Sequence, residues 1–351
     1  MPDAATPSAS PLQQALLDLA KRQSLSESLA AEVFGTVMRG EASPAQIAGL
    51  LVGLRVKGET PDEVAGVARA LRAAMVRVDA DGLHLVDTCG TGGGTVTTFN
   101  ISTAAAFVAA GAGATVAKHG NRSFTSRCGS ADVLEALGVG IGLDAPGAAR
   151  ALREARVAFL FAPNFHPAMR HVGPVRRELG IPSIMNLVGP LANPAGATRQ
   201  VLGVAEPDRA PLLAGALARL GAQHALVVHG RVGMDEISPT GVTDVWEVRG
   251  GEVRTWELDP RTHGLTVDDP GVLRGGDPAA NARRLRRILE RDGGDAAGLA
   301  AVLLNAAAAV YVAGLADSYD EGIALARDAV GSGAAGEALE RLRRASPNTS
   351  G

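Results

Sequence analysis

The segment DTCGTGGGTVTTFNIST, residues 87–103, carries the clearest chemical signal in the chain. Four of its five central positions are glycine, namely Gly90, Gly92, Gly93 and Gly94. A backbone without Cβ atoms adopts positive φ readily and brings its N–H groups close to a ligand. A helical pattern follows, so helix N-terminal amides would add partial positive charge. The segment predicts a phosphate-binding loop, with a tight turn that packs a helix on a sheet as the alternative.

Spacing narrows the kind of phosphate site. The glycines fit neither G-x-G-x-x-G with a distant acid nor G-x-x-x-x-G-K-[ST], which disfavours a dinucleotide fold and a P-loop. Asn100, Ser102 and Thr103 follow at the start of the next helix. They are either ligand contacts or helix caps, since Ser and Thr commonly cap helices.

A second polar segment, AKHGNRSFTSRCGSADVLEALG, covers 117–138. Lys118, Arg122, Arg127 and several hydroxyls lie within about ten residues of one another, before Gly129 opens a helix. Arginine forks and lysine point charges both bind phosphate oxygens, so this loop suits a pyrophosphate. A solvated charged loop is the alternative.

Two further segments complete the set. GMDEISPTG (233–241) puts Asp235 and Glu236 just after a strand, where a pair of carboxylates suits Mg²⁺ beside substrate phosphates; a surface pair of acids is the alternative. In the segment 165–194, Arg176 with an apolar wall suits an aromatic acid's carboxylate. His166 is either a site residue or a capping or core histidine.

Composition limits the classes of partner. The chain has 351 residues, 46% of them apolar, and a formal net charge of −3, which gives no whole-chain attraction for nucleic acid or an anionic membrane. Two cysteines form no disulfide framework, and the N-terminus lacks the pattern of a signal peptide, so we expect a cytoplasmic protein. The apolar runs 101–117 and 299–316 are rich in Ala and Gly and predict buried elements.

The elements that must position these residues change in kind near residue 83. Before it, capping boxes at 43–46 and 60–63 begin two amphipathic helices and predict an all-helical subdomain. After it, short apolar runs alternate with helical patterns, which is typical of an α/β domain. The expected strands are 83–87, 114–117, 157–161, 201–205 and 224–229, the expected helices 102–113 and 207–220, with a hairpin over 246–256.

Taken together in this order, the four segments resemble the anthranilate phosphoribosyltransferase family over almost the whole chain, through GTGG, NIST, KHGNR, GSADVLEALG, FHPAM, VRRELG, GPLANP and DEISPTG. The resemblance implies a class IV, nucleoside-phosphorylase-like α/β fold with a small N-terminal all-helical domain and a larger domain around a central, mostly parallel or mixed sheet. Residues 1–80, rejoined by 165–190, would form the helical, dimerising domain, and 81–345 the catalytic domain.

The same resemblance implies a homodimer with two Mg²⁺ ions per subunit. It implies transfer of the phosphoribosyl group of 5-phosphoribosyl diphosphate to the amine of anthranilate, the second step of tryptophan biosynthesis from chorismate. Ser102, Asp235 and Glu236 would serve Mg²⁺, and Lys118, Asn121, Arg122 and Arg176 would act in catalysis. The implied substrate contacts are Gly90, Gly93, Gly94, Thr98, Asn100, Ile101, Ser102, Thr103, Lys118, His119, Gly120, Asn121, Arg122, Ser123, Phe124, Thr125, Ser126, Ser130, His166 and Arg176.

The chain departs from the family pattern at a few positions. The family generally has aspartate at the position of Gly94 and serine at those of Thr125 and Cys128, and IPSIMNLVGPLANP replaces the usual RTIFNLLGPLTNP. These changes predict an altered dependence on free Mg²⁺ and leave the acceptor open. The alternatives are a paralogue acting on another amino-benzoate, a pyrimidine nucleoside phosphorylase-like enzyme, a non-catalytic nucleic-acid-binding relative and a structural dimer module.

Overall fold

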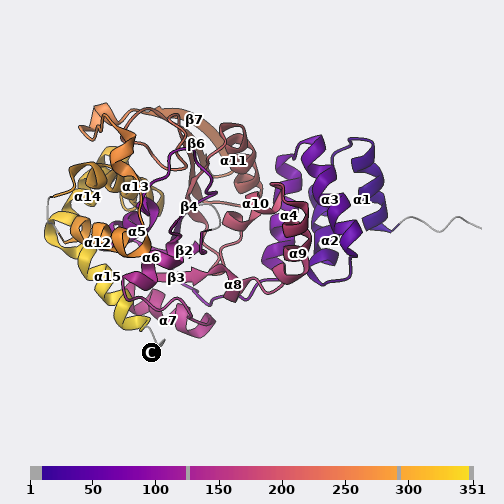
Figure 1. Cartoon of the computed structure of the whole chain (residues 1–351), viewed down its shortest axis with the longest axis horizontal. Coiled ribbons are helices and arrows are strands. Elements are labelled where there is room, and N and C mark those ends of the chain that lie inside the picture. The colour runs from indigo at the N-terminus through magenta and orange to yellow at the C-terminus, as the bar shows by residue number, and fades with distance from the viewer. Residues whose placement is uncertain (1–9, 124–126, 291–293, 348–351) are drawn as a thin grey trace, which may run out of the picture. The chain divides into compact units, whose positions relative to one another are not determined.

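The computed structural model describes residues 10–123, 127–290 and 294–347. The chain divides into two compact units, Met1–Met75 with His166–Ala192 and Val76–Phe165 with Asn193–Gly351. In Figure 1 the indigo N-terminal helices and the magenta helices α9 and α10 belong to the first unit. Each unit is built from a separate set of elements.

The first unit is all helical. Ser43 and Thr60 begin α3 and α4 with reciprocal capping boxes followed by proline, as predicted from the sequence. Leu50, Leu51 and Leu54 of α3 are buried in its core. The helices are α1 (Pro11–Ala20), α2 (Glu27–Met38), α3 (Pro44–Lys57), α4 (Pro61–Ala73), α9 (Met169–Leu179) and α10 (Met185–Val188).

A buried ion pair ties three of these helices together. The Lys57 ammonium at the end of α3 lies 2.9 Å from the Glu63 carboxylate on α4, and both side chains are at most 6% exposed. Glu63 also accepts hydrogen bonds from the backbone N–H of Leu25, just before α2, and of Thr60. Since every oxygen of the carboxylate is satisfied, the pair is held without an uncompensated charge.

The second unit is built on one mixed sheet of seven strands in the order β3-β2-β1-β4-β5-β6-β7. The five strands from β3 to β5 are parallel, and β5, β6 and β7 pair antiparallel. This confirms the α/β fold class. The strands are β1 (Leu85–Gly90), β2 (Thr115–Gly120), β3 (Val157–Phe161), β4 (Arg199–Gly203), β5 (His224–Gly230), β6 (Thr243–Arg249) and β7 (Glu252–Leu258).

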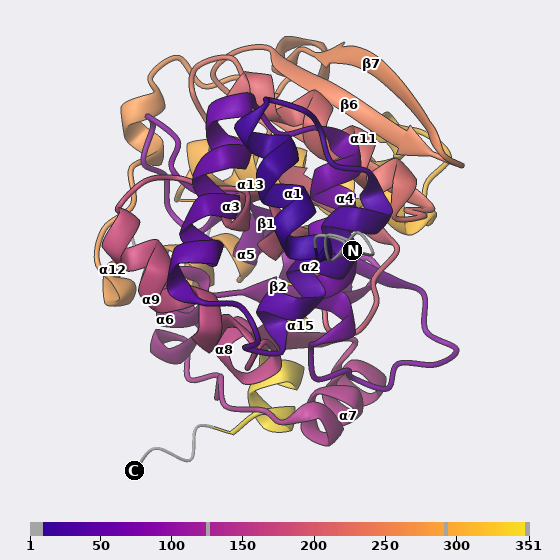
Figure 2. The same ribbon diagram turned by 90° about the vertical axis from the view of Figure 1, so that its right-hand side faces the viewer.

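The antiparallel edge is the predicted hairpin. Gly250 and Gly251 connect β6 to β7 with φ of 59° and 86°, a left-handed conformation that favours glycine. Figure 2 shows β6 and β7 as one long two-stranded ribbon. The hairpin explains why the sheet is mixed rather than wholly parallel.

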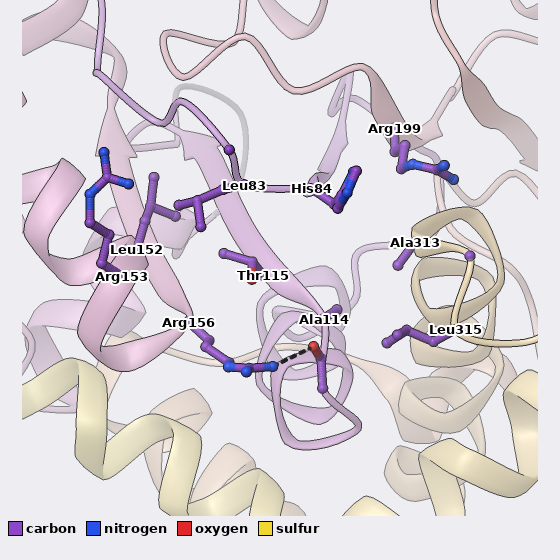
Figure 3. Close-up of a pocket in the computed structure, with 13 residues that line it drawn as sticks. Leu83, His84, Ala114, Thr115, Leu152, Arg153, Arg156, Arg199, Ala313 and Leu315 are labelled. Carbon is purple, nitrogen blue, oxygen red and sulfur yellow. Dashed lines mark hydrogen bonds between the residues drawn. The ribbon is translucent and has the colours of Figure 1, made fainter.

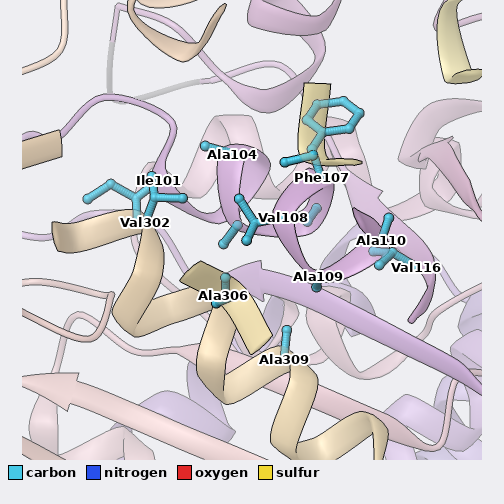
Figure 4. Packing of buried hydrophobic residues seen from close by; sticks show 14 of the residues in the cluster. Ile101, Ala104, Phe107, Val108, Ala109, Ala110, Val116, Val302, Ala306 and Ala309 are labelled. Atoms are coloured by element: carbon cyan, nitrogen blue, oxygen red, sulfur yellow. The ribbon is translucent and has the colours of Figure 1, made fainter. Parts of the chain in front are cut away.

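Alternating side chains give the sheet two buried faces. Val86, Val116 and Phe159 point to the large core made with α5 and α13, whereas Leu85 and Ala117 point to a smaller core with α7. Figure 4 shows α5 packed against α13 through small residues. The helices of this unit are α5 (Ile101–Gly111), α6 (Ser130–Ala136), α7 (Ala145–Ala155), α8 (Ala162–Phe165), α11 (Ala210–Arg219), α12 (Pro278–Leu289), α13 (Ala296–Ala313), α14 (Tyr319–Ser332) and α15 (Ala334–Ala345).

Helix α13 is the one described helix with the length and apolar composition of a membrane span. It is mostly buried, because α5 and α14 cover it and Asn305 bonds the backbone of Ile237. Its apolar character is therefore that of a core helix.

Several strand ends differ from the sequence-based expectation. β1 runs to Gly90 instead of ending at 87, because its ladder with β4 continues through Cys89 and Gly90, opposite Leu202 and Gly203. The glycine loop therefore begins inside the sheet. Periodicity alone missed this extension because glycine and cysteine carry no strand pattern.

Candidate active site

The candidate site lies at the carboxyl ends of the parallel strands, where α/β sheets generally bind ligands. β1, β2, β4 and β5 end at Gly90, Gly120, Gly203 and Gly230, and they are neighbours in the sheet. Loops that start from these four glycines therefore meet at one edge.

Missing side chains make room there for the acid pair. A Cβ on Gly203 would lie 1.7 Å from the carbonyl oxygen of Asp235, and one on Gly90 would lie 2.9 Å from its carboxylate. Asp235 Oδ2 accepts a hydrogen bond from the N–H of Gly92 at 2.9 Å, and Gly92 has a φ of 69°. The glycines at the two strand ends thus form a cradle that only the Asp235 loop fills.

The second carboxylate faces the start of α5. The backbone N–H of Ser102 donates to Glu236 Oε1 at 3.2 Å, and the Ser102 hydroxyl accepts from Lys118 Nζ at 3.3 Å. Lys118 also donates to the carbonyl oxygen of Thr88 at 2.6 Å and is only 4% exposed. Ser102, Lys118 and Glu236, three predicted site residues from distant parts of the sequence, are therefore brought into one cluster.

The cluster is electrostatically strained in the absence of a cation. Burial, followed by the charge of Asp235, raises the pKa of Glu236 to about 8, and burial also raises the pKa of Asp235. Burial lowers the pKa of Lys118, although the acids Asp87 and Glu236 oppose that shift. One ammonium group does not balance all the buried carboxyl groups around it.

The donor set fits Mg²⁺. Two buried carboxylates and the Ser102 hydroxyl are hard oxygen donors, and a divalent cation would hold both acids ionised. The described residues contain no group of three or more His, Cys, Asp or Glu that holds a metal by itself. Mg²⁺ is commonly bound by one or two carboxylates with substrate phosphates and water, which suits this incomplete set.

Asp87 is a site residue that sequence reasoning missed. Its buried carboxylate accepts hydrogen bonds from the N–H of His119 at 3.0 Å and from Asn193 Nδ2 at 2.9 Å. Burial raises its pKa to about 6. Asp87 thereby fixes the end of β2, and a carboxylate inside the apolar run LHLVD is the sequence signal that marked it.

The loop after β2 is arranged around Asn121. Its carbonyl oxygen accepts hydrogen bonds from the Ser130 hydroxyl at 3.2 Å and from the N–H of Ala131 at 3.3 Å. Gly120 lacks a side chain where a Cβ would lie 2.4 Å from Ser130 Oγ. Ser123 ends the described part of the loop, and the predicted contacts Phe124, Thr125 and Ser126 lie outside the described residues.

The predicted cation Arg122 is committed elsewhere in this structure. Its guanidinium lies 2.7 Å from Asp132 and 2.6 Å from Glu135, both on α6. The acids on the helix that follows the loop hold the arginine, and they strongly raise its pKa. Contact with a phosphate requires Arg122 to exchange these partners.

The stretch after the glycine loop divides into ligand-facing and core positions. Ile101 and Thr103 are buried in the core, and Thr103 Oγ1 has no hydrogen-bond partner within the described chain. Asn100 makes no side-chain cap; it bonds the carbonyl oxygen of Cys128 and accepts from Asn281. Thr98 pairs with Arg274 in an isolated β-bridge. Gly93 and Gly94 lie in the loop, and only Gly93 has positive φ.

The two predicted acceptor residues belong to the helical unit. His166 is buried, and burial lowers its pKa to about 4, so it is neutral near pH 7. Arg176 on α9 donates to Asn186 Oδ1 at 3.4 Å, and burial lowers its pKa. His166 and Arg176 therefore offer a neutral ring and a part-buried cation.

Comparison with known proteins identifies the family. The family model described as the glycosyl transferase family a/b domain matches residues 82–336, and the corresponding helical bundle domain matches residues 13–75. The chain is 53% identical to the anthranilate phosphoribosyltransferase of Roseiflexus castenholzii, over 95% of this chain and 97% of that protein. The chain belongs to the anthranilate phosphoribosyltransferase family. The resemblance seen in the sequence motifs is confirmed.

Solved structures of anthranilate phosphoribosyltransferases share the fold. The Thermus thermophilus enzyme matches with a TM-score of 0.87 at 46% identity, over 94% of this chain and 98% of that chain. The Saccharomyces cerevisiae enzyme in complex with PRPP and Mg matches with a TM-score of 0.86 at 28% identity, over 96% and 98%. Another yeast structure contains 4-fluoroanthranilate.

Proposed function

We propose that this chain transfers the phosphoribosyl group of 5-phosphoribosyl diphosphate to the amine of anthranilate, releasing pyrophosphate. The observation that carries the proposal is the cluster of Ser102, Lys118, Asp235 and Glu236 beside the glycine loop. Its oxygen donors and cation suit a metal-bound pyrophosphate, and its relatives act under that name.

In this reaction the bond between ribose C1 and pyrophosphate breaks as the anthranilate nitrogen bonds to C1. Positive charge develops on the sugar and negative charge on the leaving group, so stabilising pyrophosphate is the main task. Mg²⁺, when bound by Ser102, Asp235 and Glu236, supplies a divalent charge for the leaving group. The nitrogen loses one proton after attack, and an aniline nitrogen needs little deprotonation beforehand.

The residues of this chain orient and stabilise. Lys118, held by Thr88 and Ser102, keeps a buried positive charge beside the acid pair. The N–H groups of the glycine loop are free of side chains that would block a phosphate. Catalysis then rests on position more than on a strong base, and we assign no general base.

The helical unit supplies the acceptor contacts in this proposal. Arg176 would pair with the anthranilate carboxylate, because a part-buried guanidinium binds a carboxylate in a defined orientation. Neutral His166 would contact the aromatic ring or the amine. We further propose a cytoplasmic homodimer joined through the helical unit, where Leu17 and Val56 are 50% and 62% exposed.

An acceptor panel tests the proposal. Purified protein with 5-phosphoribosyl diphosphate and Mg²⁺ is mixed with anthranilate, 3-aminobenzoate or 4-aminobenzoate, and pyrophosphate release is measured alongside anthranilate fluorescence. We expect release with anthranilate and loss of its fluorescence at the same rate. Release with another amino-benzoate only would reassign the acceptor, and background release with all three would refute the transferase.

A further inference from the structure

A cavity of about 530 Å³ lies at the opposite end of the sheet from the candidate active site. It opens beside Thr115 and Arg199, the first residues of β2 and β4, and beside His84, which precedes β1. The glycine loop is at the other end of β1. Its volume is within the range of roughly 300–1,000 Å³ that small-molecule sites occupy.

The charged lining of the cavity is entirely basic. Arg153, Arg156 and Arg199 line it together with His84, and none of the described residues that line it is acidic. Arg153 has a solvated partner, Asp79, at 3.7 Å, where Asp79 is 76% exposed. In the described part of the chain, Arg156 and Arg199 make no ion pair.

Helix ends account for part of this charge. α5, α7 and α13 end at this edge, and Arg156 donates to the carbonyl oxygen of Gly113 while Arg199 donates to that of Val312. A helix C-terminus carries about half a negative charge, so three of them offset about half of three arginines. The cavity keeps a positive balance, and the buried Nε of Arg199 has no acceptor among the residues that the structure describes.

Figure 3 shows how the charges are distributed. Arg153 and Arg156 lie on one side of the cavity and Arg199 on the other, with Thr115 and Ala114 between them. The remaining lining is largely apolar and includes Leu83, Leu152 and Leu315. A ligand with two anionic groups at the ends of a short apolar chain matches this pattern.

We propose that this cavity binds a small elongated organic dianion, with an oxyanion group at Arg199 and another at Arg156. The site is independent of the proposed function, because it lies at the other end of the sheet and involves none of the residues assigned to transfer. Three arginines without a carboxylate partner in the lining give the ligand its charge requirement.

Calorimetric titration of the full chain with adipate tests the site, with neutral adipamide as the matched probe. We expect saturable binding of adipate at one site per chain, no binding of adipamide, and no competition from saturating pyrophosphate with Mg²⁺. Arg199→Gln and Arg156→Gln should each weaken adipate binding at least about tenfold, whereas Arg254→Gln on the exposed hairpin should not change it.

Two variants are used because either might disturb a helix end, and circular dichroism melting checks each fold. Absence of saturable adipate binding to the wild type, equal binding of adipamide, displacement by pyrophosphate, or unchanged affinity in a folded arginine variant would overturn the proposal. Phosphoribosyl transfer by Arg199→Gln without adipate should equal that of the wild type.

Discussion

The Asp235 carboxylate accepts a hydrogen bond from the Gly92 N–H at 2.9 Å, across 143 positions of sequence. The contact joins the acid pair to the glycine loop in one structure. It exists because Gly90 and Gly203 leave the space that the Asp235 loop occupies. Charge at Asp235 and shape at the two glycines are therefore separate requirements of the site.

Removing the charge at Asp235 tests its role toward Mg²⁺. Asp235→Asn keeps an oxygen that accepts from Gly92, so the loop should retain its conformation while the site loses one anion. We expect kcat/KM to fall by about 10²-fold or more, with a higher Mg²⁺ requirement. Steady-state rates measured across a Mg²⁺ series check this, and Asp244→Asn on the hairpin serves as control. Wild-type Mg²⁺ dependence in Asp235→Asn would contradict it.

Lys118 separates stability from activity. Lys118→Met removes a buried ammonium whose desolvation is costly, so the thermal midpoint should not fall, while kcat/KM should drop about 10²-fold. Calorimetry and initial rates measure the two effects, with the exposed Lys21→Met as control. A parallel loss of stability and activity would make Lys118 structural.

Gly94 tests the departure from the family pattern. A Cβ at Gly94 would lie 3.4 Å from Asp235 Oδ1 and 2.8 Å from the carbonyl oxygen of Gly233. Gly94→Asp therefore adds negative charge beside the acid pair, and the half-saturating Mg²⁺ concentration should fall about three- to tenfold. Gly94→Asn carries the same backbone displacement without the charge and should not shift it. Superimposable Mg²⁺ curves for Gly94→Asp and wild type would exclude this effect.

The buried Lys57–Glu63 pair governs the stability of the helical unit. Glu63→Gln leaves the Lys57 ammonium buried without its counter-charge, which should cost roughly 3 kcal/mol in the free energy of unfolding. Urea denaturation followed by circular dichroism measures the change. Glu41→Gln breaks the exposed pair with Arg39 and should have no measurable effect. Equal effects of the two substitutions would rule out a special role for burial.

His166 makes the protein sensitive to acid. Its pKa is about 4 when folded against 6.5 in the unfolded chain, so the unfolded state binds more protons in between. Its stability contribution is present above pH 6.5 and is lost as the pH falls toward 4. The wild type should lose about 2 kcal/mol from this group between pH 7.5 and 5.0.

Unfolding free energies of wild type and His166→Gln at both pH values isolate that contribution. The variant should lose about 2 kcal/mol less than the wild type over the same pH interval. Exposed His84→Gln is the control and should follow the wild type. An identical pH dependence in His166→Gln would show that burial of His166 does not drive the acid sensitivity.

Local patterns predicted the main parts of the fold and the site. The capping boxes located α3 and α4, and the alternation of strands and helices predicted the mixed α/β sheet. The glycine loop and the Asp235–Glu236 pair were recognisable because each is compact in sequence. What periodicity could not supply was strand order: β1 lies beside β4, which brings Gly203 to the cradle although more than a hundred residues separate the strands.

Arg122 shows the limit of reading charge alone. Its position in a basic loop predicted phosphate contact, but Asp132 and Glu135 on the next helix hold its guanidinium. Those acids lie one helical turn apart and face the loop, a relationship that appears only once α6 is placed. Asp87 was missed for the converse reason, since its donors His119 and Asn193 come from elements distant in sequence.

Calorimetric titration of 5-phosphoribosyl diphosphate, with and without Mg²⁺, tests most directly whether the glycine loop and the acid pair form one metal–pyrophosphate site. We expect Mg²⁺-dependent binding to the wild type and at least about 100-fold weaker binding to the double variant Asp235→Asn with Glu236→Gln. Equal affinity of wild type and double variant, or binding that does not depend on Mg²⁺, would contradict the account.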